Sequence, residues 1–166
     1  MSVNDLCSDA GVLKGSFYYF FPSKRDLALA AIDAQWDAAH TTILKPAFAA
    51  DVAPMARFRR FFGLAADRQG GERVRGCPFG NLAAEMATTD PLIRERVGLV
   101  FDQYLGYFRQ ALLDAADSDS LRAADVSGMA QPILACFQGA LLLAKTRNDA
   151  DVIVEVCELT LAGLFC

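Results

Sequence analysis

The residues best suited to binding chemistry lie together near the N-terminus, where a lysine, a glycine and a serine precede an aromatic run. A lysine ammonium, a serine hydroxyl and the free N–H groups of a helix's first turn all bind phosphate oxygens. The glycine lets a polyanion approach the backbone, and two tyrosines add phenolic donors. The candidate phosphate-contacting residues are Lys14, Gly15, Ser16, Tyr18, Tyr19 and Lys24. The alternative is that they are ordinary surface residues of a helical hairpin.

Two short helices must position this segment. The pattern S-x-x-D at residues 2–5 and again at 23–26 predicts two helix starts, because the serine oxygen accepts a free N–H and the acid complements the helix dipole. Between these caps the sequence predicts helices over about 2–9 and 13–20, joined by a turn in which Gly11 takes a positive φ. This is the layout of a helix-turn-helix whose second helix enters the major groove of DNA.

The rest of the chain also has the pattern of helices. Ala, Leu and Arg are abundant, and no alternating run rich in Val, Ile and Thr is bounded by turn residues. Pro46 is expected to end the helix that begins near Ser23, and Pro132 is expected to bend a later one. The further predicted helices cover about 23–45, 54–68, 79–88, 90–116, 126–147 and 150–165. The predicted fold class is therefore all-α.

The composition excludes several classes of protein. The 166 residues carry a net charge of −4, although residues 46–80 hold six Lys and Arg against three Asp and Glu. Five cysteines without a CxxC pair and a single histidine argue against a zinc site or a disulfide scaffold, and they fit the reducing cytoplasm. No apolar run is long enough to span a membrane, and no signal peptide is visible. With no phosphate loop and no nucleophile elbow, we expect no catalytic residue, no metal, no cofactor and no enzyme activity.

The run SVNDLCSDAGVLKGSFYYFFPSKRDL, residues 2–27, resembles the DNA-binding signature of the TetR family of bacterial transcriptional repressors. The stretch GCPFGNL, residues 76–82, resembles one branch of that family, and residues 138–144 resemble its penultimate helix. The resemblance implies an all-helical homodimer whose N-terminal heads bind palindromic operator DNA and are released by a small-molecule inducer. It also implies a helix-turn-helix head with its connecting helix over residues 1–45, and a ligand-binding and dimerisation domain over residues 46–166.

The resemblance is incomplete at the N-terminus. The family normally has a further helix before the position of Ser2, and that helix helps to form the core of the head. Without it the two short helices would expose apolar side chains, so we expect that upstream residues are missing from the sequence or that its start is misplaced. The alternative function is a helical small-molecule-binding dimer that has lost DNA binding together with this helix.

Aromatic residues recur at helical spacing in residues 46–166, and core packing explains most of them. In a bundle that senses a ligand, some of them would line an apolar cavity. The candidate ligand-binding residues are Phe62, Cys77, Tyr104 and Phe108. Nearby arginines would make the Cys77 thiol reactive, but a small packed residue at a helix start is the preferred interpretation. The cluster Arg57, Arg59 and Arg60 is expected to be solvated, with binding of an acidic inducer as the alternative.

The last two predicted helices carry apolar residues on more than one stripe, so they must be buried on several sides. A single domain of this size offers few such places, and we expect these helices to pair with the same helices of a second chain. The residues concerned are Ile133, Leu134, Phe137, Leu141, Leu142, Val152, Ile153, Val156, Leu159, Leu161 and Leu164.

Overall fold

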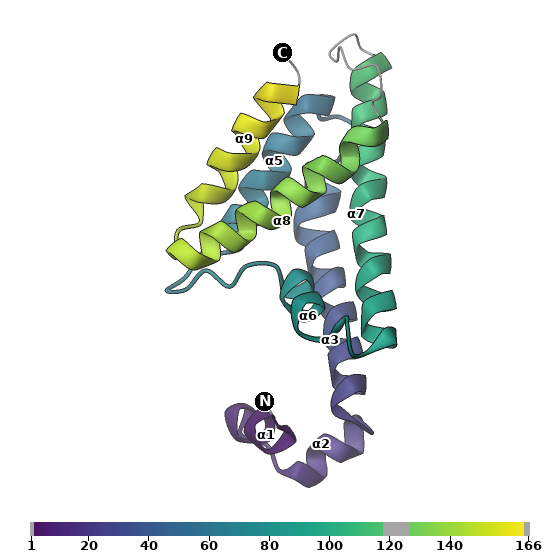
Figure 1. The fold of residues 1–166 in the computed structure, drawn as a ribbon, viewed down its shortest axis with the longest axis vertical. Helices are drawn as coiled ribbons and strands as arrows, with labels where there is room; N and C mark the ends of the chain where they lie inside the picture. Colours follow the sequence, from purple (N-terminus) through teal and green to yellow (C-terminus); the bar gives the residue numbers. More distant parts are fainter. Residues whose placement is uncertain (1, 118–126, 165–166) are drawn as a thin grey trace.

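The computed structural model describes residues 2–117 and 127–164, and within these ranges the chain is helical with no strand (Figure 1). The all-α prediction is therefore confirmed. The helices are α1 (Val3–Ala10), α2 (Lys14–Phe20), α3 (Lys24–Ala39), α4 (Lys45–Ala47), α5 (Pro54–Asp67), α6 (Pro78–Met86), α7 (Pro91–Asp117), α8 (Ala130–Arg147) and α9 (Asp151–Leu164), with a π-helical turn at His40–Leu44 and a 3-10 turn at Ser127–Met129.

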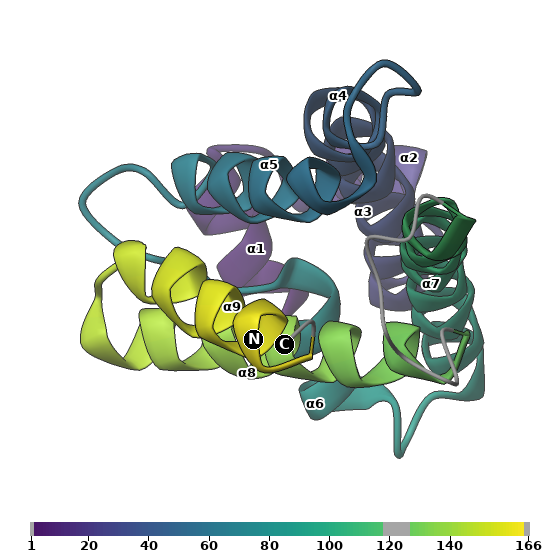
Figure 2. The same cartoon turned by 90° about the horizontal axis from the view of Figure 1, so that it is seen from above.

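The helix-turn-helix lies at one end of the molecule, and α3 connects it to the other helices (Figure 1). Along its length α3 packs against α7, and it also contacts α6. Seen from above in Figure 2, α9 lies against α5 on one side and α8 on the other, and both contacts are present in the structure. The helix α3 is therefore shared by the head, which contains α1 and α2, and by the body, which contains α5 to α9.

Pro46 does not end its helix where the sequence predicts. It is the second residue of α4, and the helix continues one residue beyond it, to Ala47. A π-helical turn precedes it, in which the N–H of Lys45 bonds to the carbonyl of His40, so the helix widens without breaking. Pro132 is the third residue of α8 and lies in its first turn, so it causes no break in the hydrogen bonding of the helix interior.

An aromatic core holds the body together. Phe58, Phe61 and Phe62 point inward from α5, and each is almost completely buried. The ring centroid of Phe61 lies 5.2 Å from that of Phe108 in α7 and 4.8 Å from that of Phe137 in α8. Rings in such close, tilted contact fill the interior densely, which keeps the surrounding helices at fixed positions.

The stretch at residues 76–82 has a structural reason for its residue types. Gly76 has a φ of +73°, a conformation that side chains with a Cβ rarely adopt. The Cys77 sulfur accepts the backbone N–H of Gly80 at 3.3 Å and so caps α6, and Phe79 is buried in the core. A Cβ on Gly80 would lie 2.8 Å from Oε1 of Gln138, so this glycine lets α6 approach α8 closely.

The Gly76→Ala variant is expected to be less stable than the wild type by about 1–2 kcal/mol, the usual cost of a left-handed conformation for a residue with a Cβ. Its new Cβ would also lie 3.2 Å from Cδ of Lys145. Urea unfolding followed by far-UV circular dichroism measures the difference. Gly98→Ala on α7 is the matched control, because its new methyl group would meet no neighbouring side chain within 4 Å and helix propensity predicts a gain of up to about 1 kcal/mol. Equal stabilities of the two variants would contradict the prediction.

Candidate nucleic-acid interface and effector cavity

The head is built by local capping, as the sequence predicts. The Ser2 hydroxyl accepts the N–H of Asp5 at 3.2 Å, and the Asp5 carboxylate accepts the N–H of Ser2 at 2.6 Å, which completes the box. This hydrogen bonding lowers the pKa of Asp5. Gly11 ends α1 with a φ of +65°, and Ser23 caps α3 by accepting the N–H of Asp26. These caps fix where α2 starts and ends relative to its neighbours.

The recognition helix α2 exposes most of the predicted contact residues. Lys14, Gly15 and Ser16 are exposed in its first turn, Tyr18 is 50% exposed and Tyr19 is 82% exposed. The remaining predicted residue, Lys24, is half-buried in the first turn of α3. No side chain caps the start of α2, so its first N–H groups stay available to an acceptor from outside.

The phenylalanines of α2 divide between two roles. Phe17 is buried, and its ring packs edge-on against Tyr18 with centroids 5.1 Å apart. Phe21 is half-buried beside it, with centroids 5.9 Å apart. Phe20, in contrast, is 69% exposed and points away from this contact. Phe17 and Phe21 therefore anchor the recognition helix to the head, while Phe20 adds to its exposed surface.

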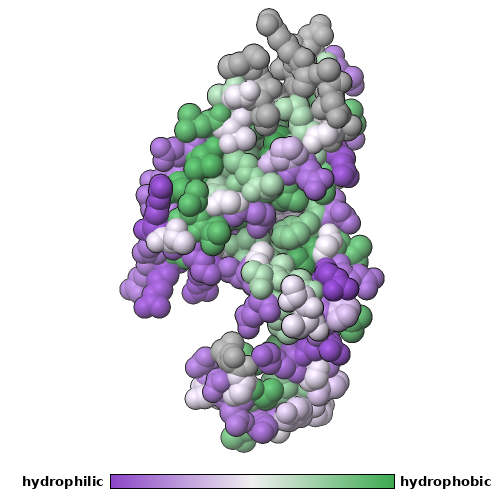
Figure 3. Space-filling view, in the orientation of Figure 1, coloured by the Kyte–Doolittle hydropathy of each residue, from purple (hydrophilic) through white to green (hydrophobic). Residues whose placement is uncertain are grey.

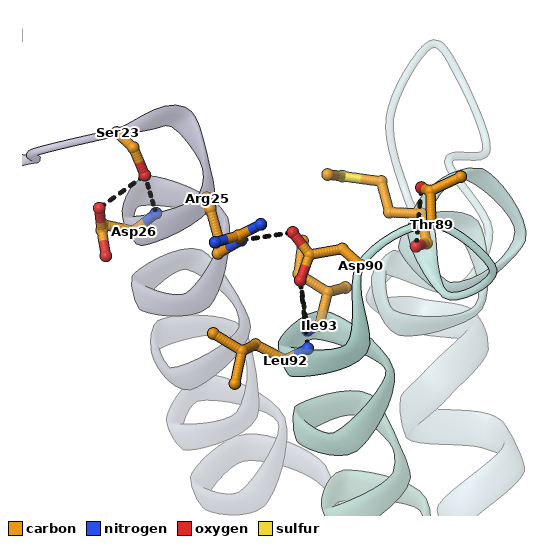
Figure 4. Close-up of polar contacts among 8 residues, drawn as sticks. Ser23, Arg25, Asp26, Thr89, Asp90, Leu92 and Ile93 are labelled. Carbon is orange, nitrogen blue, oxygen red and sulfur yellow. Dashed lines mark hydrogen bonds and ion pairs between the residues drawn. The ribbon is translucent and has the colours of Figure 1, made fainter.

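An ion pair fixes α3 to the start of α7 (Figure 4). Nε of Arg25 donates to Oδ2 of Asp90 at 2.5 Å, while Oδ1 of Asp90 accepts the N–H groups of Leu92 at 3.1 Å and Ile93 at 3.4 Å. The hydrogen bond from Arg25 is the main reason why the pKa of Asp90 lies below its ordinary value of 3.8. One nearly buried carboxylate thus caps α7 and holds the head-proximal turn of α3.

The Asp90→Ala variant is expected to lower the melting temperature more than Arg25→Ala, because it removes both the cap and the ion pair, whereas Arg25→Ala leaves the cap in place. Since folding lowers the pKa of Asp90, its stabilising effect is complete above pH 3.8 and is lost as the pH falls through the lower folded pKa. The difference between wild type and Asp90→Ala should therefore shrink in that acid range. Thermal unfolding across a pH series measures it, and a difference independent of pH would contradict the assigned role.

A narrow cavity of about 50 Å³ lies between α3, α5, α6, α7 and α8. Two of the predicted ligand-binding residues, Cys77 and Tyr104, line it. Phe62 and Phe108 do not line it and instead pack in the aromatic core, where both are almost completely buried. The helical spacing of aromatic residues could not separate these two positions, because a core stripe and a cavity wall have the same period. The remaining lining residues are Gln35, Ala39, Ile43, Ala65, Arg68, Gln69, Gly76, Pro78, Phe79, Phe137 and Leu141.

Burial raises the pKa values of two groups that line this cavity, the Cys77 thiol and the Tyr104 hydroxyl. Desolvation raises the pKa of the Cys77 thiol, so at neutral pH it is the protonated, weakly reactive form. This favours the packing and capping interpretation of Cys77 over a reactive sensor. Desolvation also raises the pKa of Tyr104 well above its usual range. The Tyr104 hydroxyl therefore stays protonated and can donate a hydrogen bond to an occupant of the cavity.

Next to the cavity, the loop between α5 and α6 (Figure 1) forms a wider and more polar mouth. Its lining includes four basic side chains, namely Arg68, Arg73, Arg75 and Lys145. None of these appeared among the candidates from the sequence. The signals that could have found the three arginines are the net positive charge of residues 46–80 and the position of Arg73 and Arg75 just before the GCPFGNL stretch, whereas no sequence signal points to Lys145.

Two of the three arginines that the sequence offered as a possible binding site for an acidic inducer already bind acceptors within the protein. Arg57 is buried and pairs with Asp114, and it also donates to the carbonyl of Val52. Arg59 pairs with Glu158 of α9 at 3.1 Å. These contacts fasten α5 to α7 and α9. The expectation that the cluster is solvated is therefore wrong for Arg57, which is buried, whereas Arg59 and Arg60 are exposed.

Helices α8 and α9 retain apolar surface after packing within the chain. Most of the residues expected to pair with a second chain are buried inside this one: Ile133, Leu134, Phe137, Leu141, Val152, Ile153 and Leu161. Leu142 is 60% exposed and Leu143 is 42% exposed on α8, and Leu159 is 69% exposed on α9. Val156 is half-buried, and the side chain of Leu164 lies outside the described part. Figure 3 shows apolar side chains on the surface over these two helices.

The chain matches family models over most of its length. Residues 1–31 match the model for bacterial regulatory proteins of the tetR family, and residues 54–159 match the tetracyclin repressor-like C-terminal domain. Within residues 2–117 and 127–164, no group of His, Cys, Asp and Glu side chains is arranged to hold a metal ion. No helix in these ranges is long and apolar enough to cross a membrane.

Individual proteins agree with these models. The transcriptional regulator AcuR of Cereibacter sphaeroides is 33% identical over 154 residues, which cover 91% of this chain and 70% of that protein. The transcriptional repressor DhaR of Mycobacterium sp. (strain GP1) is 26% identical over 153 residues, covering 90% and 75% respectively. The crystal structure of a regulatory protein TetR from Rhodobacter sphaeroides has a TM-score of 0.86 at 30% identity, covering 96% of this chain and 85% of that one. These relatives are transcriptional regulators and not enzymes, and this chain belongs to the TetR family of DNA-binding transcriptional regulators.

Proposed function

We propose that the protein is a ligand-responsive repressor that binds palindromic operator DNA as a homodimer and is released when a small molecule occupies the cavity. The observation that carries this proposal is the path of α3. Its first turn follows the recognition helix directly, and further along Gln35 and Ala39 line the cavity. A ligand that displaces this wall would tilt α3 and change the separation of the two heads.

In this proposal α2 enters the major groove and reads one half-site. Lys14, Gly15, Ser16, Tyr18 and Tyr19 contact the DNA from α2, and Lys24 adds a contact from α3. Two heads related by a two-fold axis require half-sites about 34–36 Å apart, or a multiple of that distance, because each must meet the same face of the duplex. The operator is then an inverted repeat.

The proposed division of labour follows the helices. Residues 1–45 form the DNA-binding head and connecting helix, and residues 46–166 form the ligand-binding and dimerisation domain. The outer surfaces of α8 and α9 join the two chains, and the GCPFGNL stretch, which forms one edge of the cavity mouth, marks a branch of the family. The match of residues 1–31 to the regulatory-protein model favours this proposal over a small-molecule-binding dimer without DNA binding.

Selection of the full chain on a pool of random-sequence duplexes tests the proposal. Sequencing of the retained duplexes should give an inverted repeat, and its affinity should fall steeply with salt because phosphate contacts release counterions. Addition of a small molecule that raises the melting temperature of the protein should release the selected duplex. Enrichment of no duplex, or of a single unrepeated half-site, would contradict the homodimeric repressor.

A further inference from the structure

The mouth of the cavity has an unusual excess of positive charge. Arg68, Arg73, Arg75 and Lys145 line it, and Glu72 is its one acidic lining residue. Clefts lined by one sign of charge concentrate ligands of the opposite sign. The mouth and the narrow cavity adjoin each other, because Gln35, Arg68, Gln69, Gly76 and Pro78 line both. A ligand bound where the two meet therefore lies close to these cations.

Among residues 2–117 and 127–164, no ion pair neutralises the cations of the mouth. Between the described residues, the ion pairs join Arg25 to Asp90, Arg57 to Asp114, Arg59 to Glu158 and Arg96 to Asp33. Arg68 instead donates to two neutral acceptors, Oγ1 of Thr42 at 3.1 Å and Oε1 of Gln35 at 3.2 Å. These bonds orient the guanidinium but leave its charge uncompensated, and a guanidinium has five N–H donors in total. Arg68 thus holds a positive charge at the edge of the cavity that no carboxylate contact among the described residues neutralises.

The loop that carries the other cations is also held in place. Oε1 of Gln69 accepts the N–H groups of Arg75 and Gly76, each at 3.0 Å. Oδ1 of Asn148 accepts the N–H of Val74 at 2.8 Å, and Nδ2 of Asn81 donates to the carbonyl of Arg75 at 3.0 Å. Side chains from three helices or their ends therefore fix an irregular loop. A fixed loop loses little entropy when it binds a ligand.

The narrow cavity behind Arg68 suits a short apolar group. Its walls include Phe79, Phe137 and Leu141, and its volume of about 50 Å³ admits only a small substituent. Tyr104, whose hydroxyl stays protonated, also lines this cavity, and the charge of Arg68 acts on the pKa of that hydroxyl. One charged and one neutral donor residue thus line the same narrow cavity, and the charged one also lines the polar mouth.

We propose that the effector is a small organic carboxylate. Its carboxylate binds Arg68, with a hydrogen bond from Tyr104, and its short apolar part occupies the cavity beside Phe79. Arg73, Arg75 and Lys145 attract it and add to its binding. A guanidinium fits a carboxylate through two parallel hydrogen bonds, which explains the choice of this class over a neutral ligand. The inference rests on the proposed function, since it names the class of ligand for the same cavity.

Binding can be measured directly on the full chain, without DNA, by the fluorescence of its single tryptophan. The ring of Trp36 packs edge-on against Tyr104 with centroids 5.7 Å apart, so an occupant beside Tyr104 should change its emission. The probes are propionate, butyrate and benzoate, each compared with its amide, and inorganic phosphate. We expect saturable binding of at least one carboxylate, and binding of its amide weaker by about tenfold or more, since a hydrogen bond to a charged group is worth about that factor.

The variant Arg68→Gln is expected to weaken carboxylate binding by about tenfold or more. Arg68→Lys should weaken it by less, because a lysine keeps the positive charge but lacks the two parallel N–H donors of a guanidinium. Arg73→Gln changes an exposed loop residue and should weaken carboxylate binding by a smaller factor than Arg68→Gln. It tests the inference if the Arg68 variants do not fold. Arg60→Gln is the matched control: it removes the same charge from α5, the helix that ends directly before Arg68, but Arg60 lines neither the mouth nor the cavity. Its binding should equal that of the wild type.

Three results would overturn the inference: no carboxylate binds, an amide binds as tightly as its carboxylate, or Arg68→Gln and Arg73→Gln both bind as the wild type does. A non-specific charged surface would also overturn the inference. It would be indicated if phosphate bound as tightly as the carboxylates and if Arg60→Gln weakened phosphate binding as much as Arg68→Gln does. Failure here is distinguishable from failure of the proposed function. If a neutral compound releases the selected operator, the carboxylate inference fails and the repressor proposal stands. If the protein selects no operator but binds carboxylates, the repressor proposal fails and the assignment of the ligand class stands.

Discussion

A protein carrying Leu142→Glu and Leu159→Glu is expected to be a monomer, and its affinity for operator DNA is expected to fall by about 10²–10⁴-fold. The size of this effect comes from the linkage of two heads. When the heads are joined, binding of the second half-site is intramolecular and occurs at a high effective concentration. A monomer loses that advantage without any change in its own DNA contacts.

The structure gives the reason for choosing these two residues. Leu142 on α8 and Leu159 on α9 stay exposed after α8 and α9 have packed on each other and on α5. Burying a leucine side chain at an interface gains about 1.5–3 kcal/mol, and a two-fold interface buries each residue twice. Charges at these positions would lose that gain and place unpaired charges in an apolar contact.

Sedimentation velocity measures the oligomeric state, and titration of the selected operator measures the affinity. Leu113→Arg on α7 is the control, because Leu113 is also a leucine with about half of its side chain exposed but lies on a different helix. The control should remain a dimer with wild-type affinity. A double variant that is still dimeric at low micromolar concentration would show that the chains associate through another surface.

The variant that combines Lys14→Ala with Tyr18→Phe is expected to bind the operator on the order of 10⁴-fold more weakly than the wild type. A hydrogen bond to a charged group is worth about 1.5–3 kcal/mol, and each substitution is present in both heads of the dimer. Loss of one lysine–phosphate contact in each head should also reduce the slope of log affinity against log salt by about two. A mobility-shift titration at several salt concentrations measures both quantities.

The design separates DNA contact from folding. Tyr18→Phe keeps the ring that packs against Phe17, and both changed side chains are exposed, so the melting temperature should stay close to that of the wild type. Lys45→Ala removes an exposed lysine from α4, outside the helix-turn-helix, and should leave the salt slope unchanged. If the doubly substituted head bound the operator normally, α2 would not be the recognition helix.

Local sequence patterns predicted most of the secondary structure because capping and turn formation depend on near neighbours. The serine caps of α1 and α3 and the left-handed Gly11 all occur where the spacing placed them. The prediction for Pro46 was wrong for a reason beyond its neighbours. A π-helical turn before it, in which His40 bonds to Tyr107 of α7 at 2.8 Å, lets the helix pass the proline.

The candidate site residues also differ in whether local sequence or tertiary packing decides their position. Exposure of Lys14 and Tyr18 followed from a short helix with one buried face, which the sequence alone determined together with the all-α class. Which aromatic residues face a cavity was decided only by the packing of α5, α7 and α8, because helical period cannot distinguish a wall from a core. The tertiary structure also brought Lys145 of α8 to the same mouth as Arg68 and Arg73, since residues far apart in sequence meet only when the segments that carry them are packed together.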